Sequence, residues 1–227
     1  MIQQFLSQYG YHVFLILGAV SMVILTVLRR KQYKLSIFSA VGFPLLLLFC
    51  GIAGTKLLYY VESGFTSFDG MSFFGAVYLV MLLMPIIGLM YRLKPTQTLD
   101  VCAPCVASII GFMRFGCFCA GCCGGVMCNL GGYSLRWPTQ LMEGFGDMMI
   151  LGLLLTMEQH EEKQGMLYPT FLIAYGAMRF VIEFLRDTPK TMAGLSEGQW
   201  LSLLGILIAI IWFSASRKGK VRNGSST

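Results

Sequence analysis

The sequence predicts an all-α, polytopic membrane protein with seven transmembrane helices, and three observations support this fold class. The 227-residue chain is 56% hydrophobic and 12% charged, whereas soluble domains carry about 25% charged residues. The apolar residues gather in segments that approach the length a helix needs to cross a bilayer, about 20 residues. Most basic residues fall in alternate loops. We therefore expect one integral membrane domain over residues 1–227, and we do not interpret the net charge of +6 as nucleic-acid binding.

Seven apolar segments follow one another, and the loops between them orient the chain. The segments cover approximately 11–28, 36–61, 71–91, 99–123, 140–158, 166–186 and 198–216. The first lacks the basic start and the small-residue cleavage site of a signal peptide. The loops after the first, third, fifth and seventh segments hold eleven basic residues: Arg29, Arg30, Lys31, Lys34, Arg92, Lys94, Lys163, Arg217, Lys218, Lys220 and Arg222. Because basic loops favour the cytoplasm, we expect an outer N-terminus and a cytoplasmic tail at 217–227.

The other six basic residues and five acidic residues are predicted to lie in the outer half of the membrane or just beyond it. A charge inside a span costs a few kcal/mol, so such charges are rare unless they are paired or functional. Long side chains near the end of a span can instead reach the headgroups, which is an open alternative for Lys56 and Lys190. The residues in question are Lys56, Arg114, Arg136, Arg179, Arg186, Lys190, Glu62, Asp69, Glu143, Asp147 and Glu183.

The segment YGAMRFVIEFLRD, residues 175–187, predicts an anion site. On a helix its polar residues are spaced by four, four and three, which places Tyr175, Arg179, Glu183 and Arg186 on one stripe. A guanidinium is always charged, and its planar fork suits phosphate. The alternative is an Arg–Glu pair that joins two helices. Because one such pair does not use both arginines, the anion site is the interpretation that we favour.

The segment RWPTQLMEGFGD, residues 136–147, predicts the start of the fifth span. Proline suits the first turn of a helix, and Pro138 precedes the apolar run. Glu143 and Asp147 are four residues apart on one face, where like charges repel. Basic partners from elsewhere are therefore expected, and Arg114 and Arg136 are the candidates.

Two glycines flank the start of the third span in FDGMSFFGAV, residues 68–77. Gly70 and Gly75 allow the backbone to approach another helix or a ligand closely. On these residues alone, helix packing is the better explanation.

Five of the eight cysteines lie close together, at Cys117, Cys119, Cys122, Cys123 and Cys128. Zinc sites often combine a Cys-x-x-Cys pair with a second distant pair, and neither His12 nor His160 is expected nearby. On a continuous helix Cys119 would share a face with Cys122 or Cys123, which gives two or three possible metal ligands. A disulfide on the outer side is another alternative. The interpretation that we favour is that these are small apolar residues that permit tight packing.

Together these segments resemble the prolipoprotein diacylglyceryl transferase family over about residues 50–205. GMSFFG (70–75) is similar to the family block GG-(M/F)-S-(F/I)-H-G. RFGCF (114–118), with Gly121 and Gly125, is similar to G-R-(I/L)-G-N-F-x-N-G-E-x-x-G. WPTQLME (137–143) is similar to H-P-(S/T)-Q-L-Y-E, and YGAMRFVIEFLR (175–186) to Y-G-x-x-R-x-x-(V/I)-E-F-x-R. The last two blocks are the most specific.

The resemblance implies an enzyme of the bacterial inner membrane that works without a cofactor or metal. Such enzymes move a diacylglyceryl group from phosphatidylglycerol, a membrane lipid, to the lipobox cysteine of an exported prolipoprotein. As catalytic residues it implies Arg114 and Arg179, which hold the phosphate, and Glu143 and Glu183, which orient them. As substrate-binding residues it implies Tyr175, Gln140, Arg186, Gly70, Gly75 and Gly125.

The chain also departs from the family pattern. Phe74 and Trp137 stand where the family has histidines, and cysteines replace the polar side chains of the signature block. Asp69 and Asp147 are the candidates to replace the missing base, and no pattern around them supports that role. The connection from Gly125 to Trp137 is shorter than the family's external segment. Two alternatives therefore stay open: a divergent paralogue that transfers a lipid or glyceryl group to another acceptor, and a non-catalytic lipid-binding or redox-responsive membrane protein.

Overall fold

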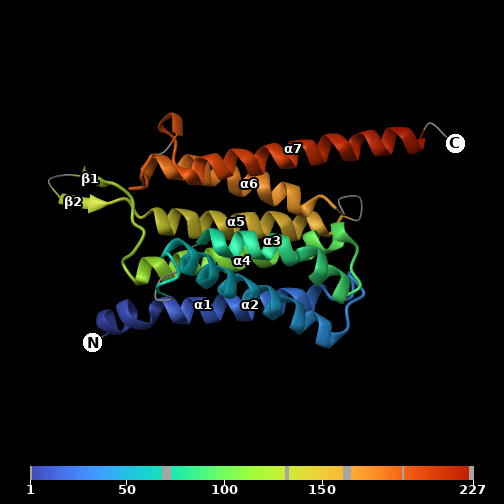
Figure 1. The fold of residues 1–227 in the computed structure, drawn as a ribbon, viewed down its shortest axis with the longest axis horizontal. Helices are drawn as coiled ribbons and strands as arrows, with labels where there is room; N and C mark the ends of the chain where they lie inside the picture. Colours follow the sequence, from blue (N-terminus) through green and yellow to red (C-terminus); the bar gives the residue numbers. More distant parts are fainter. Residues whose placement is uncertain (1, 68–72, 131–132, 161–164, 191, 225–227) are drawn as a thin grey trace. The chain divides into compact units, whose positions relative to one another are not determined.

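The structure is a computed structural model, and it describes residues 2–67, 73–130, 133–160, 165–190 and 192–224 (Figure 1). Each predicted apolar segment overlaps one helix, which confirms the predominantly helical fold class. The helices are α1 (Ile2–Arg29), α2 (Ile37–Glu62), α3 (Phe73–Met90), α4 (Pro95–Cys119), α5 (Thr139–Glu158), α6 (Leu167–Ile182) and α7 (Glu197–Gly224), with 3-10 turns η2 (Glu183–Leu185) and η3 (Met192–Gly194).

Among the described residues, four stretches are long and apolar enough to cross a membrane: Tyr9–Arg29, Ile37–Glu62, Pro95–Cys119 and Glu197–Ser214. The apolar part of α3 is shorter, at Leu79–Met90. Glu143 and Asp147 interrupt the apolar run of α5, and α6 has 16 residues, which is fewer than a span needs. The full seven-span topology and its orientation therefore stay predictions.

Residues 19–105 form one compact unit, in which α2 and α3 cross at a pair of glycines. A Cβ on Gly54 would lie 2.9 Å from the Cβ of Leu79, and a Cβ on Gly75 would lie 2.7 Å from the Cβ of Leu58. Neither distance leaves room for a side chain. Gly75, predicted to bind substrate, is thus a buried packing position, as its local sequence suggested. The core of this unit includes Phe43, Leu47, Cys50, Met84, Ile87, Leu93 and Val101.

In the same unit, a buried arginine donates hydrogen bonds to backbone carbonyls of α4 next to a proline inside the helix. Pro104 lies inside the helix and has no N–H, so the carbonyl of Asp100 loses its usual donor four residues later. Arg29 donates Nη2 to this carbonyl at 2.9 Å and Nη1 to the carbonyl of Val101 at 3.1 Å. The guanidinium also lies over the ring of Tyr33, 5.3 Å from its centroid. Arg29, counted above among the cytoplasmic loop charges, is therefore a buried structural residue.

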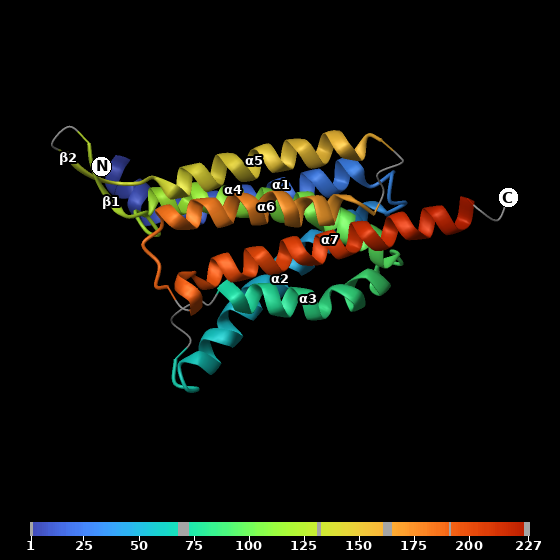
Figure 2. The same cartoon turned by 90° about the horizontal axis from the view of Figure 1, so that it is seen from above.

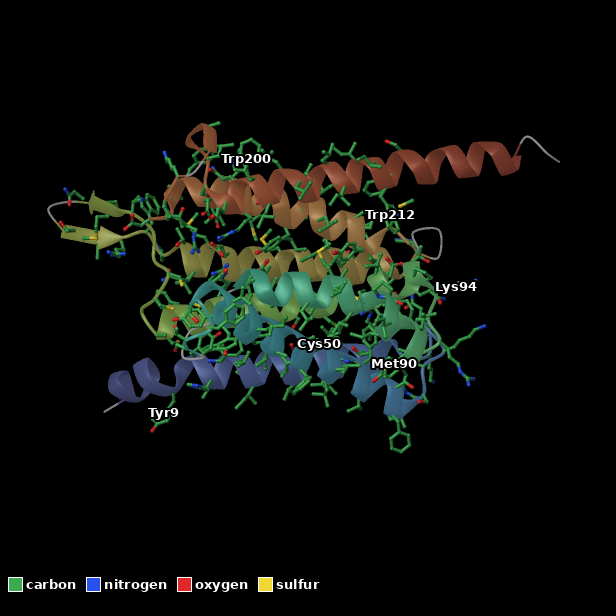
Figure 3. All side chains as sticks on the ribbon, viewed as in Figure 1. Tyr9, Cys50, Met90, Lys94, Trp200 and Trp212 are labelled. Atoms are coloured by element: carbon green, nitrogen blue, oxygen red, sulfur yellow. The ribbon has the colours of Figure 1, made fainter. Side chains whose placement is uncertain are left out.

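Residues 1–18 and 106–227 form the second compact unit. Within it α5 and α6 lie side by side, and α7 runs along α6 (Figures 1 and 2). Trp212 on α7 donates its indole N–H to the carbonyl of Gly165, just before α6, at 3.2 Å (Figure 3). This contact fixes α7 against the start of α6.

A β-hairpin fills the short connection between α4 and α5. Its strands are β1 (Met127–Leu130) and β2 (Tyr133–Arg136), which pair in antiparallel fashion. At the base, Gly125 donates its N–H to the carbonyl of Trp137 and Val126 donates to the carbonyl of Leu185, both at 2.9 Å. The hairpin was not predicted, and its base joins the end of α4, the start of α5 and the turn after α6. The base also brings the backbone of Gly125 beside that of Arg186.

Candidate functional site

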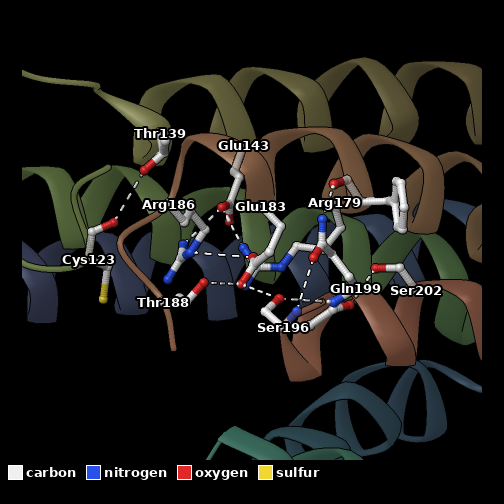
Figure 4. Close-up of polar contacts among 12 residues, drawn as sticks. Cys123, Thr139, Glu143, Arg179, Glu183, Arg186, Thr188, Ser196, Gln199 and Ser202 are labelled. Atoms are coloured by element: carbon white, nitrogen blue, oxygen red, sulfur yellow. Dashed lines mark hydrogen bonds and ion pairs between the residues drawn. The ribbon is translucent and has the colours of Figure 1, made fainter. Parts of the chain in front are cut away.

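Glu143 on α5 is the centre of an ion-pair network that joins three segments of the chain (Figure 4). Its Oε2 lies 2.5 Å from Nε of Arg114, which comes from α4. Its Oε1 lies 2.5 Å from Nη1 of Arg179 on α6 and 2.9 Å from Nη1 of Arg186, just beyond η2. The sequence predicted Arg114 and Arg136 as basic partners here. Arg114 is one of them. The prediction was wrong for Arg136, which lies exposed on β2; the other two partners of Glu143 are Arg179 and Arg186.

Glu183 is the second carboxylate of the network. Its Oε2 lies 2.9 Å from Nη2 of Arg179 and 3.5 Å from Nε of Arg186. Its Oε1 accepts hydrogen bonds from the hydroxyls of Thr188, at 2.9 Å, and Ser196, at 3.0 Å. The carboxylate that was predicted to orient an arginine is therefore itself held on both oxygens.

Ser196 and Gln199 belong to the site but were not predicted. They form a capping box at the start of α7: the N–H of Ser196 donates to Gln199 Oε1, and the N–H of Gln199 donates to Ser196 Oγ. The motif Ser-x-x-Gln was visible in the sequence as a helix start. Its link to Glu183 depends on how the chain folds back after α6, so no local pattern contained it.

Burial differs between the two signs of charge in this cluster. The side chains of Glu143 and Glu183 are 1% and 3% exposed, whereas those of the three arginines are 12–15% exposed. Three guanidinium groups face two carboxylates in these pairs, which leaves one positive charge in excess. An anion that reached the arginines would meet their partly exposed side chains and this excess charge.

Asp147 lies one turn after Glu143 and has an unusual environment for a carboxyl group. It is fully buried, and neither of its oxygens has a hydrogen-bond partner among the described residues. A buried carboxylate without a partner is costly, so this group requires either a proton or a partner from a ligand. Tyr175, on the predicted stripe, stacks on Phe171 with ring centroids 5.4 Å apart, and its hydroxyl lies within the electrostatic reach of Arg114 and Arg179.

The cysteine-rich segment after α4 folds into a tight turn beside the network. The N–H of Gly121 donates to the carbonyl of Phe118, and the N–H of Cys122 donates to the carbonyl of Cys117, both at 3.1 Å. Gly121 has φ of +69°. This is the Schellman pattern that ends a helix, with glycine in the left-handed position. The helix was predicted to continue to residue 123 and instead ends at Cys119, because Gly121 terminates it.

The start of α5 holds this turn in place. Gln140 donates its amide N–H to the carbonyl of Cys122 at 2.6 Å. Thr139 donates its hydroxyl to the carbonyl of Cys123 at 3.3 Å, as Figure 4 shows. Gln140 was predicted to bind the lipid headgroup. That contact stays a prediction, while the role seen in the structure is to fix the cysteine turn.

Three of the cysteines come together at this turn. The sulfur atoms of Cys117, Cys122 and Cys123 all lie within 4.8 Å of one another. Cys117 is buried, as tight packing requires, but Cys122 and Cys123 are exposed, so packing does not account for them. A hydrogen bond with Cys117, together with the charges of Arg186 and Arg114, lowers the pKa of the Cys123 thiol to about 5. Burial and the neighbouring Cys123 raise the pKa of Cys122.

Two glycines of the predicted substrate-binding set remain. A Cβ on Gly125 would lie 2.8 Å from the Cβ of Trp137 and 2.9 Å from Cγ2 of Thr139, so this position needs glycine for close packing at the base of the hairpin. Gly70 and Asp69 lie outside the described residues.

Comparisons with known proteins confirm the family resemblance that the sequence motifs indicated. A family model described as prolipoprotein diacylglyceryl transferase matches residues 2–215. The phosphatidylglycerol–prolipoprotein diacylglyceryl transferase of Clostridium tetani is 29% identical over 243 residues, which cover 93% of this chain and 94% of that protein. The corresponding transferase 2 of Clostridium perfringens is 26% identical over 245 residues, with coverage of 96% and 95%. The transferase of Geobacter sulfurreducens is 30% identical over 178 residues, with coverage of 69% and 68%.

Proposed function

The chain belongs to the prolipoprotein diacylglyceryl transferase family, and from that membership we propose that it moves a diacylglyceryl group from phosphatidylglycerol to the lipobox cysteine of exported prolipoproteins. The relatives carry the name of this reaction. The observation that carries the proposal for this chain is the convergence of Arg114, Arg179 and Arg186 on Glu143. The reaction releases a phosphate monoester, and this cluster is suited to that charge.

The arginines act on the phosphate of the lipid donor. Arg114 and Arg179 hold it in the ground state and stabilise the negative charge that develops as the carbon–oxygen bond breaks. Glu143 and Glu183 fix the planes of the guanidinium groups, so that little reorganisation is needed during the reaction. Arg186 adds a third donor, and the Tyr175 hydroxyl binds the headgroup nearby.

In the transfer step the acceptor sulfur attacks the glyceryl carbon that carries the phosphate. A carbon–sulfur bond forms, the carbon–oxygen bond breaks, and its electron pair leaves with glycerol 1-phosphate. The acceptor thiol gives up its proton before or during attack. Phe74 and Trp137 stand at the family's histidine positions and cannot take it. Proton removal therefore follows a different route in this chain.

We further propose a multi-pass location in the bacterial cell membrane, with the ion-pair network toward the outer side. The basic loops that follow α1 and α3, and the basic residues in the last turns of α7, support a cytoplasmic position for those helix ends. The network lies at the opposite helix ends, where α4 and α6 finish and α5 and α7 begin. An outer site matches a substrate that has already been exported.

The test is a transfer assay with purified protein, phosphatidylglycerol vesicles and a lipobox peptide. Mass spectrometry detects a peptide that has gained a diacylglyceryl group. We expect the wild-type protein to modify the peptide, and Arg179→Ala or Arg114→Ala to lower the rate by about 100-fold or more. Arg136→Ala is the matched control, because that arginine lies exposed on β2, and it is expected to keep the wild-type rate.

Two results would contradict the proposal. If Arg179→Met combined with Glu183→Leu keeps full activity, these residues only join helices. If the wild-type protein modifies no peptide while a typical family enzyme succeeds in parallel, the acceptor is not a lipobox cysteine, and the divergent-paralogue alternative is favoured.

A further inference from the structure

The thiols of Cys117, Cys122 and Cys123 have the spacing of a metal site. Their sulfur atoms all lie within 4.8 Å of one another. A tetrahedral zinc site with zinc–sulfur bonds of about 2.3 Å places its sulfur atoms about 3.8 Å apart. The three side chains therefore need to move by about 1 Å or less to bind one ion. Soft thiolate donors of this kind select zinc or copper(I) over magnesium and calcium.

The backbone around these thiols is fixed before any metal arrives. In the Schellman turn, the third residue before the C-cap, Ala120, and the second residue after it have adjacent side chains, and these are Cys117 and Cys122. Gln140 and Thr139, both buried at the start of α5, bind the carbonyls of Cys122 and Cys123. Cys123 has φ of +61°, an unfavourable conformation for a residue with a side chain. The fold thus maintains a strained position that directs a third thiol to the other two.

The cluster is open on one side and lies beside the arginines. Cys122 and Cys123 are exposed, so both an ion and a further ligand can reach them. Cys123 lies within the electrostatic reach of Arg186 and Arg114, and the backbone of Gly125 pairs with that of Arg186. These cations balance the negative charge of three thiolates around a divalent ion. Three protein ligands also leave the fourth position of a tetrahedral zinc free, as in catalytic zinc sites.

We propose that Cys117, Cys122 and Cys123 bind a zinc ion as thiolates, and that the acceptor cysteine occupies the fourth position. This inference rests on the proposed transfer function. The acceptor thiol releases its proton to solvent when it binds zinc, because a coordinating thiol is deprotonated. The bound sulfur then attacks the glyceryl carbon, and the phosphate leaves toward Arg114 and Arg179. The metal site replaces the base that Phe74 and Trp137 cannot supply. The resemblance had implied an enzyme without metal, and the cysteines distinguish this chain from that expectation.

The first experiment measures the metal alone. Reduced, purified protein is titrated with zinc in competition with a chromophoric chelator, and with cobalt(II), whose thiolate complexes show a charge-transfer band in the near ultraviolet. We expect one ion per chain. Cys122→Ser or Cys123→Ser should weaken zinc binding by at least about tenfold, because even the loss of a group that only supports a ligand costs about that much. Cys128→Ser is the matched control, because Cys128 lies on β1 outside the cluster, and it should bind zinc as the wild type does.

The metal site is wrong if no stoichiometric ion binds, if the triple variant Cys117→Ala/Cys122→Ala/Cys123→Ala binds zinc as tightly as the wild type, or if mass spectrometry of unreduced membranes finds two of these cysteines joined as a disulfide. Folding of the variants is verified by their thermal unfolding in detergent.

The second experiment separates this inference from the proposed function. A lipobox peptide is added to the cobalt-loaded protein, and a peptide with serine in place of the cysteine serves as control. A change in the charge-transfer band with the cysteine peptide alone supports the fourth-position role. Full transfer activity after complete removal of metal would overturn that role while the transferase function stands. Metal binding and a peptide-dependent spectrum without any transfer would instead contradict the proposed function and leave the metal site intact.

Discussion

At the scale of single residues, two carboxyl groups one turn apart on α5 have opposite situations. Glu143 contacts three guanidinium groups, and Asp147 has no hydrogen-bond partner among the described residues. Both are almost completely buried. Both residues lie on the same face of α5, so helical spacing does not distinguish them. The difference arises because the arginines of α4 and α6 lie close enough to form ion pairs with Glu143.

This contrast predicts opposite effects on stability. Glu143→Gln removes the charge shared by three buried cations, and breaking such a pair costs about 3–5 kcal/mol. Asp147→Asn keeps the shape and removes the need to bury an unpartnered charge, so the free energy of unfolding should rise by about 1 kcal/mol. Thermal or denaturant unfolding of the two variants in the same detergent measures both effects. A destabilised Asp147→Asn protein would show that this carboxyl has a partner in the folded protein.

The residue scale also shows what the sequence could predict of the site. The stripe Tyr175, Arg179 and Arg186 follows from helical spacing alone, and the need of Glu143 for basic partners follows from its neighbour Asp147. The hydrogen bond from Ser196 to Glu183 could not be predicted, because the two residues are 13 positions apart and meet only through the fold of the chain. The sequence also did not identify which cysteine joins Cys122 and Cys123. On a continuous helix that residue would be Cys119, but the turn at Gly121 brings Cys117 beside them instead.

At the scale of secondary structure, α4 shows how a helix tolerates a proline in its interior. Pro104 leaves the carbonyl of Asp100 without its helical donor, and Arg29 supplies a charged one. The sequence placed Arg29 correctly at the end of the first segment. It could not reveal the partner, because 71 residues separate Arg29 from Asp100.

The pairing of Arg29 with the proline defect predicts a rescue. Arg29→Met should destabilise the protein by about 2 kcal/mol, because it removes charged hydrogen bonds to buried carbonyls. In a Pro104→Ala background the helix recovers its own N–H donor, so the same Arg29→Met change should cost about 1 kcal/mol less. Unfolding of the four proteins of this double-mutant cycle measures the coupling. Equal costs in both backgrounds would show that Arg29 acts only through its other contacts, such as the ring of Tyr33.

At the scale of the whole molecule, the sequence predicted the helices well and their lengths less well. The periodic apolar segments mark α1 to α7, because burial in lipid or protein requires an apolar surface over the whole segment. Helix ends depend on local turns, so the end of α4 at Gly121 was missed. The β1–β2 hairpin was also missed, since a connection of this length carries no hydrophobic periodicity. The membrane orientation rests on loop charges alone.

The orientation predicts which cysteines can be labelled from outside the cell. In a Cys122→Ala/Cys123→Ala background, Cys128 on β1 should react with a membrane-impermeant maleimide in intact cells. Lys94→Cys, added to this background with Cys128→Ser, should react only after the membrane is permeabilised, because the loop before α4 is expected to be cytoplasmic. Mass spectrometry of the labelled protein gives the extent of reaction. Labelling with the reverse pattern would invert the topology and place the ion-pair network inside.

The order of synthesis gives the shared Glu143 a further consequence. A ribosome produces Arg114 first and Glu143 next, and it adds Arg179 and Arg186 only 36 and 43 residues later. While α5 leaves the ribosome, Arg114 is therefore the one partner of this network that already exists. An arginine and a glutamate enter a bilayer at lower cost as a neutral pair than as separate charges. If α4 and α5 insert together as a helical hairpin, and α6 and α7 follow, then Glu143 has a basic partner at every stage of insertion.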